Sequence, residues 1–216
     1  MKNNILNKKF KYTYCNAAAY LIAANVVVFV LTYFVNPVIN GLSLFYWLSL
    51  VPPLVSHGYV WQVVTYMFVH ASYSHLFFNM FAILMFGMTL ERAVGSREFL
   101  FFYFVTGTLG GITSYLVSIF SGQTNVIMLG ASGAIYALLF LTSVMFPTAR
   151  ILLFFIIPLK MPFAVMLYII IEVVSQIMDL RGGIAHLIHL SGIVYAWIYC
   201  ILRFRISPVR VWKDAL

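Results

Sequence analysis

Long apolar segments dominate this chain, and they limit the folds open to it more than any other feature. Charged residues, prolines and glycines divide the chain into stretches that carry almost no charge. A helix needs about 20 mostly apolar residues to cross a bilayer, and several of these stretches approach that length. With 63% hydrophobic and only 8% charged residues, the 216-residue chain lacks the polar surface of a water-soluble domain. We therefore expect an all-α integral membrane protein.

Six candidate spans can be placed on the sequence. They are Ala17–Val35, Leu76–Leu90, Phe99–Phe120, Gly130–Phe146, Phe163–Met178 and Ile184–Phe204. A further apolar run, Ile151–Ile157, is too short to cross and is followed by two prolines and a lysine, so we interpret it as a dipping or interfacial segment. The predicted domain is the six-span bundle 17–204, between a basic N-terminal segment, 1–16, and a basic cytoplasmic tail, 205–216.

The first loop, Asn36–Ser74, is the one long connection between predicted spans. It is aromatic, but prolines and polar residues interrupt it too often for a span. Its residues Tyr46, Trp47 and Trp61 suit the headgroup region of a bilayer, where amphipathic rings are enriched. We expect this large outer loop to form short interfacial helices.

The basic residues predict an orientation. If the N-terminus is cytoplasmic, twelve Lys and Arg residues fall on the inner side and only Arg181 falls outside. The inner residues are Lys2, Lys8, Lys9, Lys11, Arg92, Arg97, Arg150, Lys160, Arg203, Arg205, Arg210 and Lys213. We therefore expect a multi-pass membrane protein with both termini in the cytoplasm. As its location we expect the inner membrane of a bacterial cell. The net charge of +8 is then explained by basic residues on the inner side of the membrane, and no nucleic-acid partner is expected.

Polar residues inside the spans are the best indicators of function, because they are costly in lipid. They are His75 and Asn79 in the second span, Ser132 and Tyr136 in the fourth, Glu172 and Gln176 in the fifth, and His189 in the sixth. Residues four apart share a helix face, so the members of the first two pairs point the same way.

Ser132 and His189 lie at similar depths. The second, fourth and sixth spans all begin at the outer face, and a rise of 1.5 Å per residue places the two side chains roughly 5 Å apart in depth. Small residues flank both of them and let helix backbones approach closely in lipid. These are Gly130, Gly133 and Ala134 near Ser132, and Gly192 and Ala196 on the side of His189. The sequence therefore predicts a hydroxyl nucleophile beside an imidazole base.

Several motifs in register resemble those of the rhomboid family of intramembrane proteases. His70-Ala-Ser-Tyr-Ser-His75-Leu-Phe-Phe-Asn79 is similar to the family's HxxxxHxxxN pattern, and Gly130-Ala-Ser132-Gly-Ala-Ile-Tyr136-Ala to its GxSGxxYA pattern. The segment Ala185-His-Leu-Ile-His189-Leu-Ser-Gly192 resembles the last-helix histidine segment. One departure is Trp61-Gln62, where many members have Trp-Arg.

The resemblance covers most of the chain and implies a six-span serine endopeptidase that cuts membrane-anchored proteins near the outer face, without a cofactor. It implies that Ser132 is the nucleophile and His189 the general base and acid. The oxyanion would be bound by the Ser132 amide with the side chains of His75 and Asn79, supported by Gly130 and Tyr136. His186 is an alternative base, but the spacing to Gly192 favours His189.

The sequence places no Asp or Glu at the depth of His189, so a Ser-His dyad is expected, with the imidazole held by packing against Tyr136. Glu172 is interpreted as a structural hydrogen-bonding residue. A metal is not expected, because the chain has no HExxH and no acidic residue lies near His186 and His189 in the sequence.

Two other functions stay open at this point. The first is a catalytically inactive relative that binds membrane proteins. The second is a small proton-linked transporter using Glu172, Gln176 and the histidines. The natural substrate, the cleavage-site sequence and the oligomeric state are not specified by the sequence.

Overall fold

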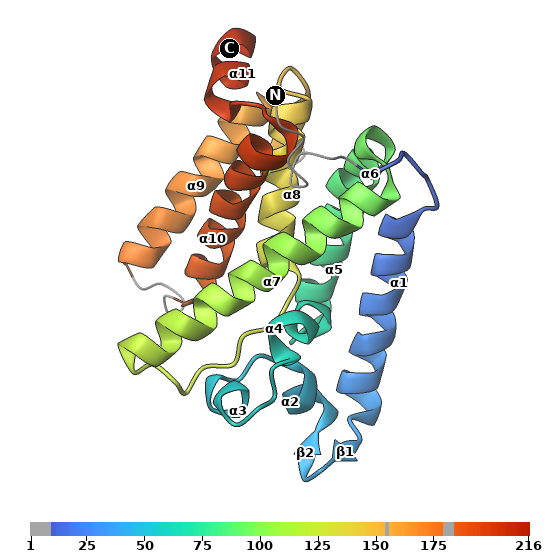
Figure 1. The fold of residues 1–216 in the computed structure, drawn as a ribbon, viewed down its shortest axis with the longest axis vertical. Coiled ribbons are helices and arrows are strands. Elements are labelled where there is room, and N and C mark those ends of the chain that lie inside the picture. The colour runs from blue at the N-terminus through green and yellow to red at the C-terminus, as the bar shows by residue number, and fades with distance from the viewer. Residues whose placement is uncertain (1–9, 154–155, 179–183) are drawn as a thin grey trace, which may run out of the picture.

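The structure is a computed structural model that describes residues 10–153, 156–178 and 184–216 (Figure 1). Its longer helices are α1 (Ala17–Val30), α5 (Tyr73–Ala82), α6 (Met88–Val94), α7 (Ser96–Ser121), α8 (Ser132–Met145), α9 (Met161–Ile177) and α10 (Ile184–Tyr199). Three π-helical turns extend or join them: η2 (Leu31–Val35) after α1, η4 (Ile83–Gly87) between α5 and α6, and η5 (Cys200–Phe204) after α10.

Every predicted span coincides with a helix, to within a few residues at the ends. Within the described residues, four helical segments are long and apolar enough to cross a membrane, namely Ala17–Val35, Tyr73–Val94, Ser96–Ser121 and His186–Phe204. The fourth and fifth predicted spans are the shorter apolar helices α8 and α9. The protein is thus a mostly helical integral membrane protein, while the count of six crossings stays a prediction.

Helix α8 is at the centre of the bundle, which explains how it can be short. Every residue from Gly133 to Val144 except Tyr136 is buried. Helices α7 and α10 pack against it (Figure 1). A Cβ atom on Gly192 of α10 would lie 2.1 Å from the carbonyl oxygen of Gly133. The α8–α10 crossing is therefore a backbone-to-backbone contact of the kind that small residues allow in membranes.

The first loop forms short helices, as predicted. It contains the antiparallel strands β1 (Val38–Ile39) and β2 (Leu42–Ser43), the helices α2 (Leu44–Leu48), α3 (Pro52–Ser56) and α4 (Gln62–Thr65), and the 3-10 turn η3 (Tyr66–Phe68). The buried Gln62 ties the loop together: its Oε1 accepts from the Val51 amide at 3.0 Å and its Nε2 donates to the Tyr46 carbonyl at 2.8 Å. At the position where many members of the resembled family have arginine, Gln62 thus makes contacts of its own within the loop.

Buried carboxylates brace the opposite end of the bundle. Glu91 accepts hydrogen bonds from the backbone amides of Ala17 and Ala18, at 2.6 and 2.9 Å, and so caps the first turn of α1. Glu98 is bound by the Arg203 guanidinium, with N–O distances of 2.8 and 2.9 Å. These contacts join α6 to the start of α1, and the start of α7 to the π-helical turn η5 that follows α10.

Two segments next to the spans adopt structures that the sequence did not specify. The described ends of the run Ile151–Ile157 lie in two antiparallel strands, β3 (Arg150–Leu153) and β4 (Ile157–Lys160). The dipping or interfacial placement of this run stays a prediction. The predicted C-terminal tail contains the helix α11 (Pro208–Ala215). Trp212 of α11 donates to the Ser143 carbonyl at 3.2 Å, so this segment is docked on α8.

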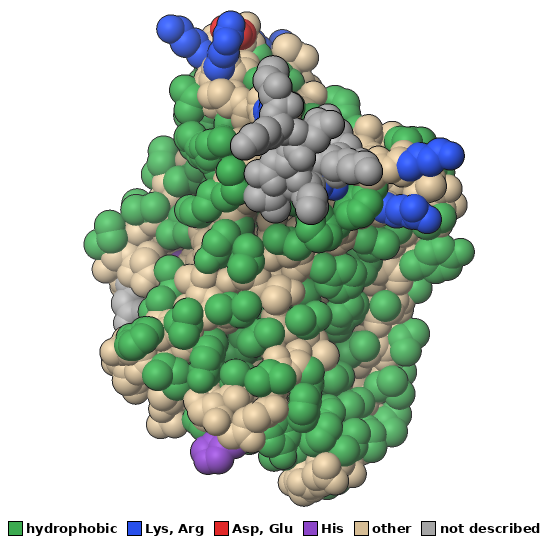
Figure 2. Space-filling view, viewed as in Figure 1, with side chains coloured by type: hydrophobic (Ala, Val, Ile, Leu, Met, Phe, Trp, Pro, Cys, Tyr) green, Lys and Arg blue, Asp and Glu red, His purple; other side chains and the backbone are tan. Residues whose placement is uncertain are grey.

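The surface shows the expected separation of charge. In the face drawn in Figure 2, Lys and Arg side chains gather at the end that carries α11 and α6, and the flanks are largely hydrophobic. Lys2, Lys8, Lys9 and Arg181 lie outside the described residues. The orientation in the membrane stays a prediction.

Candidate active site

Ser132 and His189 meet between α8 and α10. His189 Nε2 lies 2.8 Å from Ser132 Oγ, which is hydrogen-bond distance. Ser132 is half-buried, and the His189 side chain is 20% exposed, so the pair is not sealed inside the bundle. A hydroxyl hydrogen-bonded to an imidazole can act as a nucleophile that the ring deprotonates.

The chain turns sharply just before Ser132. An isolated bridge pairs Met128 with Leu50 of the first loop. Gly130 then adopts a φ of 104°, which is strained for residues with a side chain, and its amide donates to the Tyr66 carbonyl at 2.9 Å. The turn starts α8 with Ser132 in its first helical position.

His75 and Asn79 lie on the other side of this turn. Ser72 Oγ accepts from the His75 amide at 3.2 Å and so caps the start of α5. A Cβ atom on Gly130 would lie 2.6 Å from His75 Nε2 and 3.5 Å from Asn79 Nδ2, which places both side chains against the backbone that precedes Ser132. Asn79 Nδ2 is buried and has no hydrogen-bond partner among the described residues, so it is an available donor.

His70, the first histidine of the same motif, lies outside the candidate spans and packs behind His75. The two ring centroids are 4.9 Å apart. Burial, and to a smaller extent the nearby His75, lower the pKa of His70 to about 4, although a hydrogen bond to the Phe68 carbonyl opposes the shift. His70 is therefore uncharged at neutral pH and supports the His75 ring without adding charge to the site.

Tyr136 holds the His189 ring from one side, as the sequence predicted. The two rings are stacked, with centroids 4.4 Å apart and an interplanar angle of 9°. Tyr136 follows Ser132 by one helical turn, so the same face of α8 carries the Ser132 hydroxyl and the ring that stacks on His189.

The prediction that no acidic residue reaches His189 is wrong. Glu172 of α9 places Oε1 3.0 Å from His189 Nδ1, and the Tyr136 hydroxyl donates to the same oxygen. Helix α9 runs opposite to the second, fourth and sixth predicted spans, so its C-terminal end is the predicted outer end. Glu172 precedes Met178, the predicted outer end of its span, by six residues, roughly 9 Å, and this matches the depth of His189.

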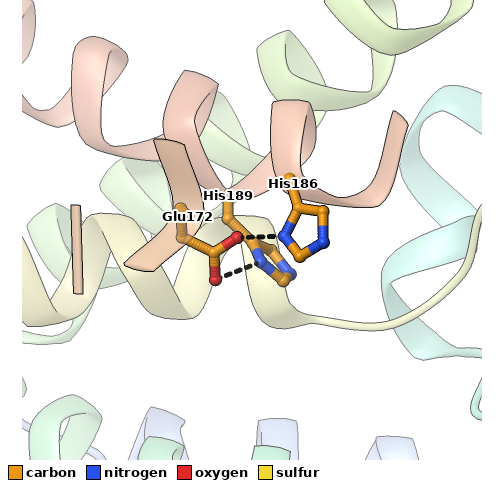
Figure 3. A group of neighbouring side chains, drawn as sticks. All are labelled: Glu172, His186 and His189. Atoms are coloured by element: carbon orange, nitrogen blue, oxygen red, sulfur yellow. Dashed lines mark hydrogen bonds and ion pairs between the residues drawn. The ribbon is translucent and has the colours of Figure 1, made fainter. Parts of the chain in front are cut away.

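His186 also binds Glu172. Its Nδ1 lies 2.5 Å from Oε2 (Figure 3). The hydrogen bond to Ser132 is made by His189. The structure thus places His189, rather than His186, beside the hydroxyl. Gln176, the other polar residue predicted in this span, has a buried Oε1 that lacks a hydrogen-bond partner among the described residues.

Glu172 approaches both histidines, although no acidic residue lies near them in the sequence, so the ground for expecting no metal does not hold. One ligand atom from each of Glu172, His186 and His189 lies within 4.8 Å of the others, and such a donor set suits Zn²⁺. However, both Nδ1 atoms and both carboxylate oxygens already form hydrogen bonds, at 2.5 and 3.0 Å. Through these contacts the carboxylate bridges the two histidine rings, and the absence of a metal stays a prediction.

Comparisons with known proteins agree with the motifs. The family model for the rhomboid domain matches residues 57–206. The chain is 36% identical over 84 residues to the putative rhomboid protease YdcA of Bacillus subtilis, covering 39% of this chain and 40% of that protein. It is 36% identical over 88 residues to rhomboid-like protease 1 of Toxoplasma gondii, covering 41% and 29%. It is 35% identical over 80 residues to the rhomboid protease GlpG of Haemophilus influenzae, covering 37% and 38%. The matched segments thus span well under half of these relatives.

Proposed function

Because the chain belongs to the rhomboid family, we propose that it is an intramembrane serine endopeptidase that cleaves transmembrane segments of other membrane proteins near the outer face. The observation that carries the proposal is the 2.8 Å contact between Ser132 Oγ and His189 Nε2 in a partly exposed site. The similar proteins are named as rhomboid proteases, which supports the same activity.

In the proposed reaction, Ser132 Oγ attacks the scissile carbonyl carbon and His189 Nε2 takes the hydroxyl proton. The C–N bond then breaks, and His189 returns the proton to the leaving amine. Water attacks the resulting ester, again with His189 as base, and releases Ser132. Hydrolysis needs water, and the partial exposure of His189 supports its access to the site.

The tetrahedral oxyanion needs hydrogen-bond donors, and we assign this role to the Ser132 amide, His75 and Asn79. The unpaired Asn79 Nδ2 supports the assignment, because a buried amide without a partner is costly unless a ligand uses it. Losing one such donor typically costs about 3 kcal/mol of transition-state stabilisation.

We place the protein in a bacterial inner membrane as a six-span bundle, 17–204, with both termini cytoplasmic. The gathering of Lys and Arg at one end supports this orientation. In intact cells, a cysteine introduced at the exposed His57 in the first loop should react with a membrane-impermeant thiol reagent, whereas the exposed Cys15 should not. The reverse labelling pattern would invert the assigned orientation.

The activity is tested by incubating a model single-span protein with wild type, Ser132→Ala and His189→Ala and mapping the products by mass spectrometry. We expect cleavage by wild type and a loss of about 10³-fold or more in both variants. Ser191→Ala is the matched control, because Ser191 is buried on the same helix as His189 and, among the described residues, its hydroxyl bonds only the Ile188 carbonyl of its own helix. Equal cleavage by wild type and Ser132→Ala would refute the proposal.

The inactive-binder alternative is separated by a fluorophosphonate probe, which labels activated serines. Labelling that disappears in Ser132→Ala supports the enzyme. A wild-type protein that stays unlabelled while it still captures membrane proteins supports the binder.

A further inference from the structure

The hydrogen bonds at His189 form a chain of three groups. Ser132 Oγ lies 2.8 Å from Nε2, and on the opposite side of the ring Nδ1 lies 3.0 Å from Glu172 Oε1. The order is nucleophile, base and carboxylate, and each group comes from a different helix: α8, α10 and α9. Figure 3 shows the carboxylate facing both histidine rings.

The carboxylate determines which ring nitrogen carries the proton. A neutral imidazole has one donor and one acceptor nitrogen, and an ionised carboxylate can only accept. Glu172 therefore places the proton on Nδ1, which leaves Nε2 free to accept the Ser132 proton. With the tautomers exchanged, Nε2 would be a donor and could not act as the base.

The surroundings of Glu172 favour its ionised form. The residue is only 5% exposed, and a buried carboxylate is stable in a membrane only if donors surround it. Three donors do so: Tyr136 and His189 at Oε1, and His186 at Oε2. Tyr136 both donates to Glu172 and stacks on His189. The stacking fixes the plane of the His189 ring, and the hydrogen bond to Glu172 fixes its Nδ1 edge.

From this geometry we propose that Glu172 is a positioning residue for the proposed proteolysis, completing a Ser132–His189–Glu172 triad across three helices. The proposal rests on the proposed function. It differs from the purely structural role expected from the sequence, because a structural carboxylate would stabilise α9 without changing the rate at which folded enzyme turns over.

The test compares wild type, Glu172→Gln and Val173→Ala in proteoliposomes with the model substrate. Gln keeps the shape of Glu but offers an amide that can donate to Nδ1 and so favours the wrong tautomer. We expect kcat of folded Glu172→Gln to fall by about 10²-fold with KM changed by less than about threefold, as for a group that acts through the base. Val173, the neighbour of Glu172, is exposed on α9, so Val173→Ala should match wild type.

A second measurement is independent of whether the variant folds. In wild-type protein labelled with ¹⁵N-histidine, the His189 signal, assigned by its absence in His189→Ala, should report the Nδ1–H tautomer. The Nε2–H tautomer in wild type would overturn the proposal.

The other outcomes are also decisive. If Glu172→Gln turns over within about threefold of wild type while Ser132→Ala is inactive, the triad fails and the proposed function stands. If chelators abolish wild-type cleavage, Glu172 acts as a metal ligand and the triad fails. If wild type does not cleave and does not label with fluorophosphonate, the proposed function fails and the positioning role falls with it.

Discussion

Helices α8 and α10 meet through their backbones, whereas the second half of α9 meets them mainly through one carboxylate. At the α8–α10 crossing, Gly133 and Gly192 leave no room for even a methyl group. On α9, the buried residues of the first turns are apolar up to Val165, and beyond it Glu172 is the one buried residue of the helix. Tyr168 adds an edge-on contact to Tyr136, with centroids 6.1 Å apart.

The difference separates two requirements of the site. Backbone contact fixes how far apart Ser132 and His189 lie, because close-packed helices cannot slide without overlap. The polar attachment of α9 instead fixes the orientation and tautomer of the His189 ring, since hydrogen bonds are directional. Changes at the crossing should therefore lower stability and activity together, and changes around Glu172 should alter activity more than stability.

Gly192→Ala should have the largest effect on stability. Its new methyl group would lie 2.1 Å from the Gly133 carbonyl oxygen, so the helices must separate. Overpacking typically costs 1–3 kcal/mol, and we expect a loss of about 3 kcal/mol here because the obstacle is backbone. Thermal unfolding in detergent and the cleavage assay measure both losses. Val194→Ala, at an exposed position of α10, is the control. Wild-type unfolding temperature in Gly192→Ala would contradict the rigid crossing.

Val165→Ala should have an intermediate effect, on stability alone. Val165 is 1% exposed, and removing two methyl groups from a buried site costs roughly 2 kcal/mol. Because Val165 precedes Glu172 by about two helical turns, kcat per folded molecule should match wild type well below the unfolding temperature. A selective loss of kcat would show that the two halves of α9 do not act separately.

His186→Phe should have the smallest effect, and mainly on activity. It keeps a ring but removes the donor to Glu172 Oε2, worth about 1 kcal/mol, while Tyr136 and His189 still hold Oε1. We expect kcat to fall about threefold to tenfold. His186→Asn, which can still donate, should be closer to wild type. A loss as large as that of Glu172→Gln would assign His186 a direct part in the reaction.

The contrast also explains which parts of the site could be predicted. Ser132 and His189 could be paired because they lie near the starts of spans that run in the same direction, beside glycines. Glu172 lies at the same depth, but depth does not specify which way a side chain faces around its helix. The stacking of His189 on Tyr136 could be expected from the shared face of Ser132 and Tyr136, whereas the carboxylate comes from a third helix whose rotation depends on packing.

By itself, the sequence determined that the protein resides in the membrane, where its helices lie and which hydroxyl and imidazole come together, because apolar length, helical period and small residues are local properties of the chain. The tertiary structure decided that Glu172 and His186 join the site, that strands β3 and β4 pair with each other and that α11 docks on α8. These depend on how helices are rotated and packed, which distant residues determine jointly and no local pattern records.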